Sequence, residues 1–483
     1  MIMSIGLLPP VHAQPVGIPS MGAASSAELS PMLERTLGDA LMERGRHDPD
    51  YISDPDVNQY LTRMGRKLVS YSPNGAQHIQ VFAVRDPQIN AFAMPGGYIG
   101  VNSGLVVSSS NESELASVLA HEIGHVVMRH IARGMTQKSQ NGGVMLASMV
   151  AALLAALSGS GDLAMGMASF GQAAAINRQL SFSRSAEQEA DREGFRMMSK
   201  AGYDPRGMAQ MFRLLMNTSR LNEGSGGSEF TSTHPLSIQR LSDIENRIGE
   251  SPPVHHQDSN AFWYVRAKLR AIQADDSRSR RQALHQFQAD AKALSGVEQS
   301  AAWYGVAYIA QVDQNTALAE SALRHAREQG ADSPEIDQLA ISLASGQGHG
   351  QQALKLAHAA WSRWPDSQGI ALAVAQTMQR NGDDKDAVAF LGDRIKQWSD
   401  LPVLYKLQAQ SDERLGKKVD ARRAMASYYE KTGALPTAVE QLRQARSLSR
   451  DFYVQSELDA QIRDLKQRLD TERSLLKQFK IQP

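Results

Sequence analysis

The sequence contains no cysteine among its 483 residues. This absence excludes disulfide bonds, thiol nucleophiles and thiolate zinc sites, so any metal ion must be held by histidine and carboxylate side chains. A net charge is also absent, because Lys plus Arg and Asp plus Glu number 51 each. Without an excess of basic residues, nucleic acid is not favoured as a partner.

Long apolar runs are lacking as well. No run of about 18 consecutive apolar residues occurs in the chain, so the sequence predicts no membrane-spanning helix. The nearest candidate, GVMLASMVAALLAALSG at residues 143–159, has too few apolar residues and is bracketed by glycines. We expect a buried or lid helix at 143–159, and a peripheral membrane contact is the alternative.

The N-terminal stretch MIMSIGLLPPVHAQPV combines a short apolar run with Val11-His12-Ala13, which fits a signal-peptidase site. Basic residues are missing before the apolar run. Residues 1–20 are therefore expected to be a signal peptide cleaved near Ala13 or, alternatively, a disordered tail.

Two of the 13 histidines, His121 and His125, enclose a glutamate in the pattern H-E-x-x-H. On a helix, positions i and i+4 project from one face, so both imidazoles can reach a single metal ion. Glu122 lies beside the first histidine, where it can contact a water on that metal without being a ligand. This is the pattern of zinc proteases if the segment is helical, and a buried helix with fortuitous histidines is the alternative.

The residues around this motif favour a helix. Asn111 is a candidate N-cap and Glu114 closes a capping box with it, while Gly134 is the expected end of the helix. Apolar residues recur at helical spacing between these limits, at Leu115, Val118, Leu119, Val126 and Val127.

A third metal ligand must come from elsewhere in the chain. The metzincin pattern H-E-x-x-H-x-x-G-x-x-H is excluded, because Met128 occupies the glycine position and His130 comes one residue early. The stretch SFSRSAEQEADREGFRMMSKAGYDP at 181–205 instead predicts a second helix, with Ser185 as its cap.

Two acids four residues apart on this second helix are the best candidates. Glu187 would complete a His2Glu site that leaves one position open for water. Asp191 would then hydrogen-bond one of the ligand histidines from behind. The neighbouring Glu189 and Glu193 are less suitable, and an ordinary solvated acidic face is the alternative for the whole segment.

The segment before the first helix predicts two strands. HIQVFAV alternates apolar Ile79, Val81 and Ala83 with other residues, and the turn at 95–97 precedes a second strand at 98–101. An extended peptide substrate could add to this second strand through main-chain hydrogen bonds. A purely structural hairpin is the alternative.

The C-terminal half repeats with a period of 34 residues. Gly348, Gly382 and Gly416 are separated by this interval. A glycine between helices and a small residue where they cross, at this period, is typical of tetratricopeptide repeats. Such repeats stack into an α-solenoid, so this half is expected to bind rather than to catalyse. The alanines with the same spacing are Ala319, Ala353, Ala387 and Ala421.

These patterns divide the chain. After residues 1–20, we expect a zinc metalloprotease domain at 21–255 and a tetratricopeptide-repeat domain at 256–483. The Pro-rich stretch 251–260 is the predicted linker, and we interpret its His256, like the adjacent histidine before it, as a surface residue. The predicted fold class is mostly α: active-site helices with a small β-sheet, followed by the solenoid.

Four strings between residues 30 and 250 resemble one known family. NAFAMPGGYIGVNSGL, LAHEIGHVVMRH, SRSAEQEAD and STHPLSIQR are similar, in this order, to the gluzincins that include HtpX, the CAAX prenyl proteases and mitochondrial Oma. The resemblance implies one zinc ion per chain, held by His121, His125 and Glu187, with Glu122 as general base. The chain departs from the membrane-embedded branches because their spanning helices are missing.

Among the soluble members, the chain is most similar to periplasmic protease-chaperones that carry C-terminal tetratricopeptide repeats. This implies a Gram-negative periplasm and clients that are unfolded or misassembled proteins, in particular outer-membrane β-barrel proteins and their assembly machinery. The residues alone do not indicate these partners.

The Gly/Ser-rich stretch at 217–235 ends in His234-Pro235. The His234 imidazole could enter the open metal position as a fourth, regulatory ligand, hydrogen-bond the oxyanion of the tetrahedral intermediate, or serve only the local structure. Arg240 in the same string could steady the segment or bind substrate.

The sequence therefore predicts a zinc-dependent endopeptidase with a chaperone-like arm, acting in quality control and assembly of outer-membrane proteins. A chaperone or scaffold whose metal site is silent or autoinhibited is the alternative from another class. A purely structural zinc site would require four protein ligands and would have no use for Glu122.

Overall fold

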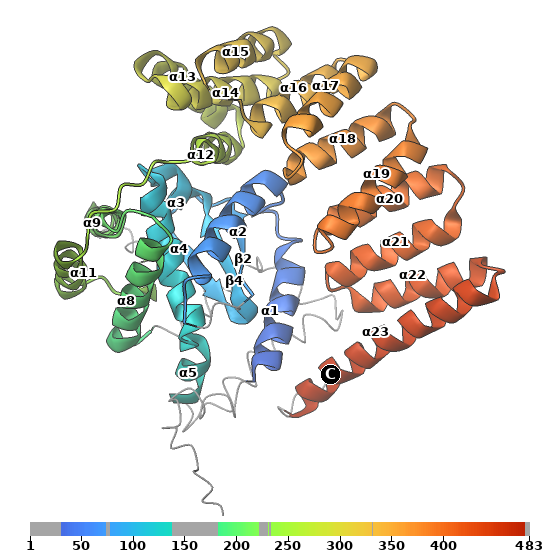
Figure 1. The fold of residues 1–483 in the computed structure, drawn as a ribbon, viewed down its shortest axis with the longest axis horizontal. Helices are drawn as coiled ribbons and strands as arrows, with labels where there is room; N and C mark the ends of the chain where they lie inside the picture. Colours follow the sequence, from blue (N-terminus) through green and yellow to red (C-terminus); the bar gives the residue numbers. More distant parts are fainter. Residues whose placement is uncertain are drawn as a thin grey trace, which may run out of the picture.

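A computed structural model shows a mostly helical molecule with one small β-sheet, which confirms the predicted fold class (Figure 1). The expected signal peptide and the segment 143–159 lie outside the residues that the structure describes. None of the helices in the described part of the chain is long and apolar enough to cross a membrane. The described residues are 30–73, 78–137, 182–221, 230, 233–330 and 332–478.

The sheet has four strands in the order β1-β2-β4-β3: β1 (Tyr51–Ile52), β2 (Gln80–Val84), β3 (Ala91–Met94) and β4 (Tyr98–Asn102). β2 pairs with β4 in parallel, and β3 folds back antiparallel onto the other side of β4. Both edges of β4 are therefore occupied, and the prediction that a peptide could add to this strand is wrong. The strands at the two edges of the sheet are β1 and β3.

The N-terminal part contains eight described α-helices in addition to this sheet. The helix α4 lies at their centre and is buried along almost its whole length. It packs against α8, α9, α2 and β3. The bounds of the eight helices are α1 (Pro31–Gly45), α2 (Pro55–Val69), α3 (Ser103–Ser108), α4 (Glu112–Val127), α5 (His130–Gln137), α8 (Arg184–Lys200), α9 (Arg206–Leu221) and α11 (Ile238–Glu250).

The start of α4 agrees with the sequence, but its end does not. The Asn111 side chain accepts a hydrogen bond from the backbone N–H of Glu114 at 2.9 Å, as an N-cap should. The helix ends at Val127 rather than at Gly134. The backbone reverses at Arg129, which has a φ of 53°, and α5 begins immediately afterwards. This break carries none of the usual Gly or Pro signals.

The start of α8 also differs from the prediction. Ser183 rather than Ser185 is the N-cap, and its hydroxyl accepts from the backbone N–H of Ala186. The first part of the predicted loop at 217–235 belongs to α9, which continues to Leu221, and residues 222–229 are not described.

The C-terminal part is an arm of helix pairs, α12 to α23 (Figure 1). The predicted repeat glycines Gly348, Gly382 and Gly416 each lie in the turn between the two helices of a pair, with a φ between 75° and 83°. The four repeat alanines are all buried, with exposed fractions of 0–3%. The bounds are α12 (Asn260–Gln273), α13 (Ser277–Ala293), α14 (Gly296–Val312), α15 (Thr316–Gln329), α16 (Pro334–Gly346), α17 (Gly350–Arg363), α18 (Gln368–Arg380), α19 (Asp384–Gln397), α20 (Pro402–Arg414), α21 (Lys418–Lys431), α22 (Leu435–Leu448) and α23 (Phe452–Gln478).

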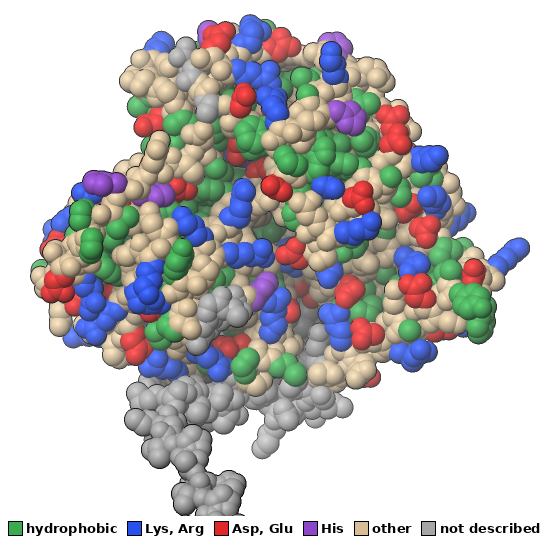
Figure 2. All heavy atoms as spheres, viewed as in Figure 1, with side chains coloured by type: hydrophobic (Ala, Val, Ile, Leu, Met, Phe, Trp, Pro, Cys, Tyr) green, Lys and Arg blue, Asp and Glu red, His purple; other side chains and the backbone are tan. Residues whose placement is uncertain are grey.

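The first helix of the arm is shared between two cores. Phe262, Val265 and Leu269 of α12 are fully buried in the core of the N-terminal part. Tyr264 and Ala267 on its other face belong to the core of the arm. Further along the arm, α18 contacts α2. On the face shown in Figure 2, charged side chains of both signs are interspersed over both parts.

Candidate metal centre

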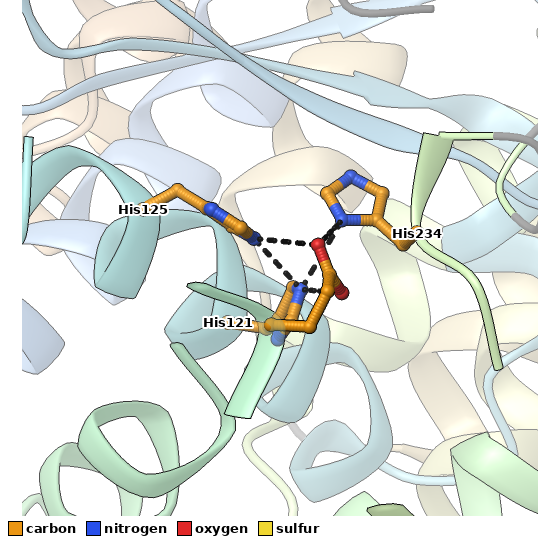
Figure 3. Close-up of side chains that lie close together, drawn as sticks. His121, His125 and His234 are labelled. Carbon is orange, nitrogen blue, oxygen red and sulfur yellow. Dashed lines mark hydrogen bonds and ion pairs between the residues drawn. The ribbon is translucent and has the colours of Figure 1, made fainter. Parts of the chain in front are cut away.

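Four buried side chains from three places in the chain converge beside the sheet (Figure 3). His121 and His125 project from α4, Glu187 comes from the first turn of α8, and His234 precedes α11. One ligand atom of each lies within 4.8 Å of the ligand atoms of the others. The residues that the sequence predicted as metal ligands are thus brought together, and the regulatory candidate His234 is among them.

The two α4 histidines turn the same ring nitrogen towards the centre. The Nε2 atoms of His121 and His125 are 3.1 Å apart. The Nδ1 of His121 points away from the centre and lies 2.9 Å from Asp191 Oδ1, the contact predicted for this aspartate. A carboxylate behind a ligand histidine fixes the tautomer and leaves the opposite nitrogen free for a metal.

Arg240 holds the two α8 carboxylates in place. Its guanidinium donates to both oxygens of Asp191, at 2.7 and 2.8 Å, and Nη1 lies 2.7 Å from Glu187 Oε2. The same Nη1 donates to the backbone carbonyl of Pro235, one residue after His234. Because Arg240 is 5% exposed and engaged in these contacts, the geometry favours the reading that it steadies the segment.

The charges around the centre shift the pKa values of its members. Burial opposes the charged imidazolium of His121, yet its hydrogen bonds to Asp191 and Glu187 raise its pKa to about 10. Burial would raise the pKa of Asp191, but the hydrogen bonds from Arg240 and His121 hold it below its ordinary value. Burial, together with the neighbouring charged His121, keeps the pKa of His125 well below its ordinary value.

Glu122 lies next to the cluster without belonging to it. Its Oε2 accepts a hydrogen bond from the backbone N–H of Ala93 in β3 at 3.1 Å. Its Oε1 is 3.5 Å from His234 Nε2, and no described residue hydrogen-bonds to it. Burial raises the pKa of Glu122, and the positive charges of His234 and His121 partly offset this.

These residues fit a metal ion. His121 Nε2 lies 3.1 Å from His125 Nε2 and 3.3 Å from His234 Nδ1, and buried ring nitrogens that face one another this closely are costly unless something between them satisfies their lone pairs. The convergent donor set consists of imidazole nitrogens and one carboxylate. Imidazole favours transition metals, whereas calcium and magnesium prefer oxygen ligands.

A second group of potential ligands, Glu112, His256 and Asp258, does not fit as well. The carboxylate of Glu112 already accepts hydrogen bonds from Tyr60, from Ser259 and at 2.9 Å from His256. The prediction that His256 is a surface residue is wrong, because the linker folds back and places its ring between Glu112 and the Gly202 carbonyl.

Sequence reasoning missed two neighbours of His125. The Phe182 ring stacks on its imidazole with centroids 4.0 Å apart. His130, considered only as a metzincin ligand and rejected, lies with its Nδ1 2.9 Å from His125 Nδ1. The spacing of five residues gave no signal, because positions i and i+5 of a continuous helix do not share a face.

Comparisons with known proteins agree with this geometry. The model of peptidase family M48 matches residues 55–248. The beta-barrel assembly-enhancing protease of Escherichia coli (strain K12) is 30% identical over 471 residues, which cover 96% of this chain and 94% of that protein. A relative from Vibrio cholerae is 33% identical over 61% of this chain, but the match spans only 60% of that protein.

Two further matches cover less of the chain or are weaker. The mitochondrial metalloendopeptidase OMA1 of Schizosaccharomyces pombe is 32% identical over 40% of this chain and 53% of its own length. The structure of yeast Tom70 covers 79% of this chain and 85% of its own, with 14% identity and a TM-score of 0.28, which is too low to support an inference. Since the identity to the E. coli protease extends over nearly the whole of both chains, this chain belongs to peptidase family M48 and is a metallopeptidase.

Proposed function

We propose that the metal is zinc and that His121, His125 and Glu187 hold it. The observation that carries this proposal is the convergence of these side chains with His234 in one buried cluster. Two imidazoles and one carboxylate are a common ligand set of catalytic zinc, which keeps a further position open. The absence of cysteine leaves no thiolate alternative.

In the proposed reaction, Glu122 is the general base. When bound, zinc supplies polarisation of the scissile carbonyl and a lowered pKa of the attacking water. Glu122 accepts the proton of this water at Oε1 and passes it to the leaving amine. The Ala93 N–H occupies Oε2 and so leaves Oε1 for the proton. Burial raises the pKa of Glu122, which brings the base closer to the pH at which it works.

His234 is proposed as a fourth ligand that keeps the enzyme latent. Its Nδ1 lies 3.1 Å from Glu187 Oε1 and 3.3 Å from His121 Nε2, within the ligand cluster. With His234 on the metal, four protein ligands would leave no place for the nucleophilic water. The alternative role, a hydrogen bond to the oxyanion, uses the same position of the ring but requires it to release the metal.

The proposed setting is the periplasm of a Gram-negative bacterium, after signal-peptide cleavage near Ala13. The name of the E. coli relative supports a role in the assembly of outer-membrane β-barrel proteins, with misassembled barrels as clients. The helical arm would bind these clients over its broad surface. We keep 21–255 and 256–483 as the proposed division into domains, with α12 packed against both cores.

The test of the proposed activity is Glu122→Gln in the full-length chain. Purified unaltered protein should carry about one zinc ion, and the variant should keep this zinc but lose cleavage of an unfolded protein substrate. Glu245→Gln, on an exposed part of α11, is the matched control and should change neither. Loss of zinc in Glu122→Gln would show that Glu122 is a ligand and that its assignment as the base is wrong.

The placement of His234 among the ligands also favours a second candidate, a binding protein whose metal site is silent. The two candidates predict different genetics. If cleavage is the main activity, Glu122→Gln should not restore barrel assembly in cells that lack the unaltered protein. If this variant restores assembly and a deletion of residues 275–483 does not, binding is the main activity.

A further inference from the structure

The chain places His130 behind the metal ligand His125 by an abrupt turn. In a continuous helix, five residues correspond to a rotation of about 140°, so the two rings would point apart. The left-handed backbone of Arg129, with a φ of 53°, instead brings His130 back towards α4. The Arg129 side chain is anchored to Glu34 of α1 at 2.8 Å, which holds the turn in this conformation.

His130 lies between a ligand and a carboxylate. The exposed fraction of the residue is 2%. Its Nδ1 is 2.9 Å from His125 Nδ1, and its Nε2 is 2.8 Å from Glu189 Oε2. Arg133 also donates to Glu189 Oε2, at 2.8 Å. The described contacts thus form an unbroken series from the metal cluster to the surface of α8.

The chemistry of these atoms allows one consistent arrangement of protons. A metal on His125 Nε2 leaves the ring proton on Nδ1, which must then donate to His130 Nδ1. His130 accepts at Nδ1 and carries its own proton at Nε2, where it donates to the Glu189 carboxylate. No ring needs a second proton, and the guanidinium of Arg133 balances the carboxylate charge.

We propose that His130 and Glu189 form a chain of hydrogen bonds, here called the relay, that holds the His125 ring in position for zinc. Asp191 does the same for His121. The stacked Phe182 ring restrains the plane of the His125 imidazole, and the hydrogen bond to His130 restrains its rotation within this plane. His130 is therefore a positioning residue, and it does not touch the metal or the substrate. The proposal deepens the proposed zinc site and rests on it.

The measurement that tests the relay is the zinc dissociation constant of the full-length chain, determined by competition with a chromophoric chelator. Removing a group that orients a ligand typically weakens metal binding about 10–100-fold. We expect this loss for His130→Leu, which has no acceptor for His125. His130→Asn should lose less, because its Oδ1 can accept from His125 Nδ1. Glu189→Ala should show a smaller loss than His130→Leu, and His285→Asn, an exposed control on α13, should show none.

A merely structural role for His130 predicts another result. In that case the melting temperature of the metal-free protein would fall, while zinc affinity would be unchanged or equally reduced in the Leu and Asn variants. Either outcome overturns the relay. If His130→Leu does not fold, unchanged zinc affinity in both His130→Asn and Glu189→Ala overturns it as well. Failure of the unaltered chain to bind zinc would instead contradict the proposed function itself.

Discussion

At the scale of single residues, the metal centre is organised by charge. When all three are ionised, the buried carboxylates of Glu122, Glu187 and Asp191 and the guanidinium of Arg240 leave two negative charges. Buried charge is stable only when it is paired, and a divalent cation would neutralise this pair of charges. In the metal-free protein, the raised pKa of His121 supplies part of the compensation as an imidazolium.

The first prediction concerns latency. If His234 blocks the metal, His234→Ala should raise basal cleavage of a short peptide, because the fourth position becomes available to water. If it donates to the oxyanion, the same variant should lose about 100-fold or more in kcat. Steady-state kinetics on zinc-loaded protein distinguishes the two by sign. An unchanged rate with unchanged zinc affinity would contradict both roles.

The residues of the centre were predictable to different extents. His121 and His125, and the acid pair on the second helix, could be predicted because residues four apart on a helix share a face. His130 was not recognised, because its position depends on the left-handed turn at Arg129. Glycine or asparagine would have signalled such a turn, whereas arginine does not.

At the scale of elements, the ligand set depends on how closely α4 and α8 approach. A Cβ added at Gly124 would lie 2.9 Å from the carbonyl oxygen of Ala190. One added at Gly194 would lie 3.0 Å from the carbonyl carbon of Ala120. Two glycines, one on each helix, therefore let the backbones meet where His121 and Glu187 lie together in the candidate metal cluster.

The second prediction tests this approach. Gly124→Ala should push the helices apart, reduce the free energy of unfolding by about 1–3 kcal/mol and weaken zinc binding. Gly249→Ala in α11 is the matched control, since the added Cβ would meet nothing within 4 Å outside its own stretch of helix in the described structure. It should leave zinc affinity unchanged and raise stability by up to about 1 kcal/mol. Zinc affinity is measured by chelator competition and stability by denaturant unfolding. If the two variants bind zinc equally well, the close approach of α4 and α8 is not what the metal cluster requires.

The elements also show why sequence patterns predict some boundaries and miss others. The repeat glycines of the arm were predictable because the turn between the two helices of each pair requires a residue with a positive φ, which glycine adopts readily. The corresponding position of the preceding repeat is Gln314, which adopts a φ of 59°. Because this residue is not a glycine, the repeat was not recognised from the glycine spacing. In the sheet, residues 98–101 were read as a strand, but pairing order depends on a parallel crossover that no local pattern specifies.

At the scale of the whole molecule, the arm contacts α2 of the protease part at more than one point along its length. Asp56 of α2 accepts hydrogen bonds from Ser367 and from the backbone N–H of Gly369, both at 3.0 Å. Lys268 of α12 pairs with Asp54 at 2.5 Å and lies 3.8 Å from Asp56. Glu335 of α16 is buried nearby, and no described residue hydrogen-bonds to its Oε2. None of these contacts was predicted, since each joins residues distant in sequence.

The third prediction concerns Glu335 in this buried contact between the arm and the protease part. Burial, with the negative charge of Asp56, raises the pKa of Glu335 from 4.5 to about 7. Between these values the folded chain holds a proton that the unfolded chain has lost, so this group makes stability fall as pH rises from 4.5 to 7. Glu335→Gln removes this pH dependence. As pH rises from about 5 to about 8, the free energy of unfolding of the variant should therefore increase by on the order of 1–3 kcal/mol relative to that of the unaltered chain.

Urea unfolding of both zinc-saturated proteins at these two pH values gives the difference directly. Glu320→Gln on α15 is the matched control, because Glu320 is exposed on the surface of the arm, and its stability relative to the unaltered chain should not change with pH. A constant difference between Glu335→Gln and the unaltered chain would mean that Glu335 is ionised in the folded state.

The central claim is that His121, His125 and Glu187 hold a catalytic zinc ion beside Glu122. The most direct measurement is diffraction from crystals of the zinc-loaded full-length chain, collected on both sides of the zinc absorption edge. We predict one anomalous peak about 2.0–2.2 Å from the Nε2 atoms of the two histidines and from a Glu187 oxygen, with His234 or water in the remaining position. A peak at Glu112 and His256 instead, or a peak bound directly by Glu122, would contradict this claim.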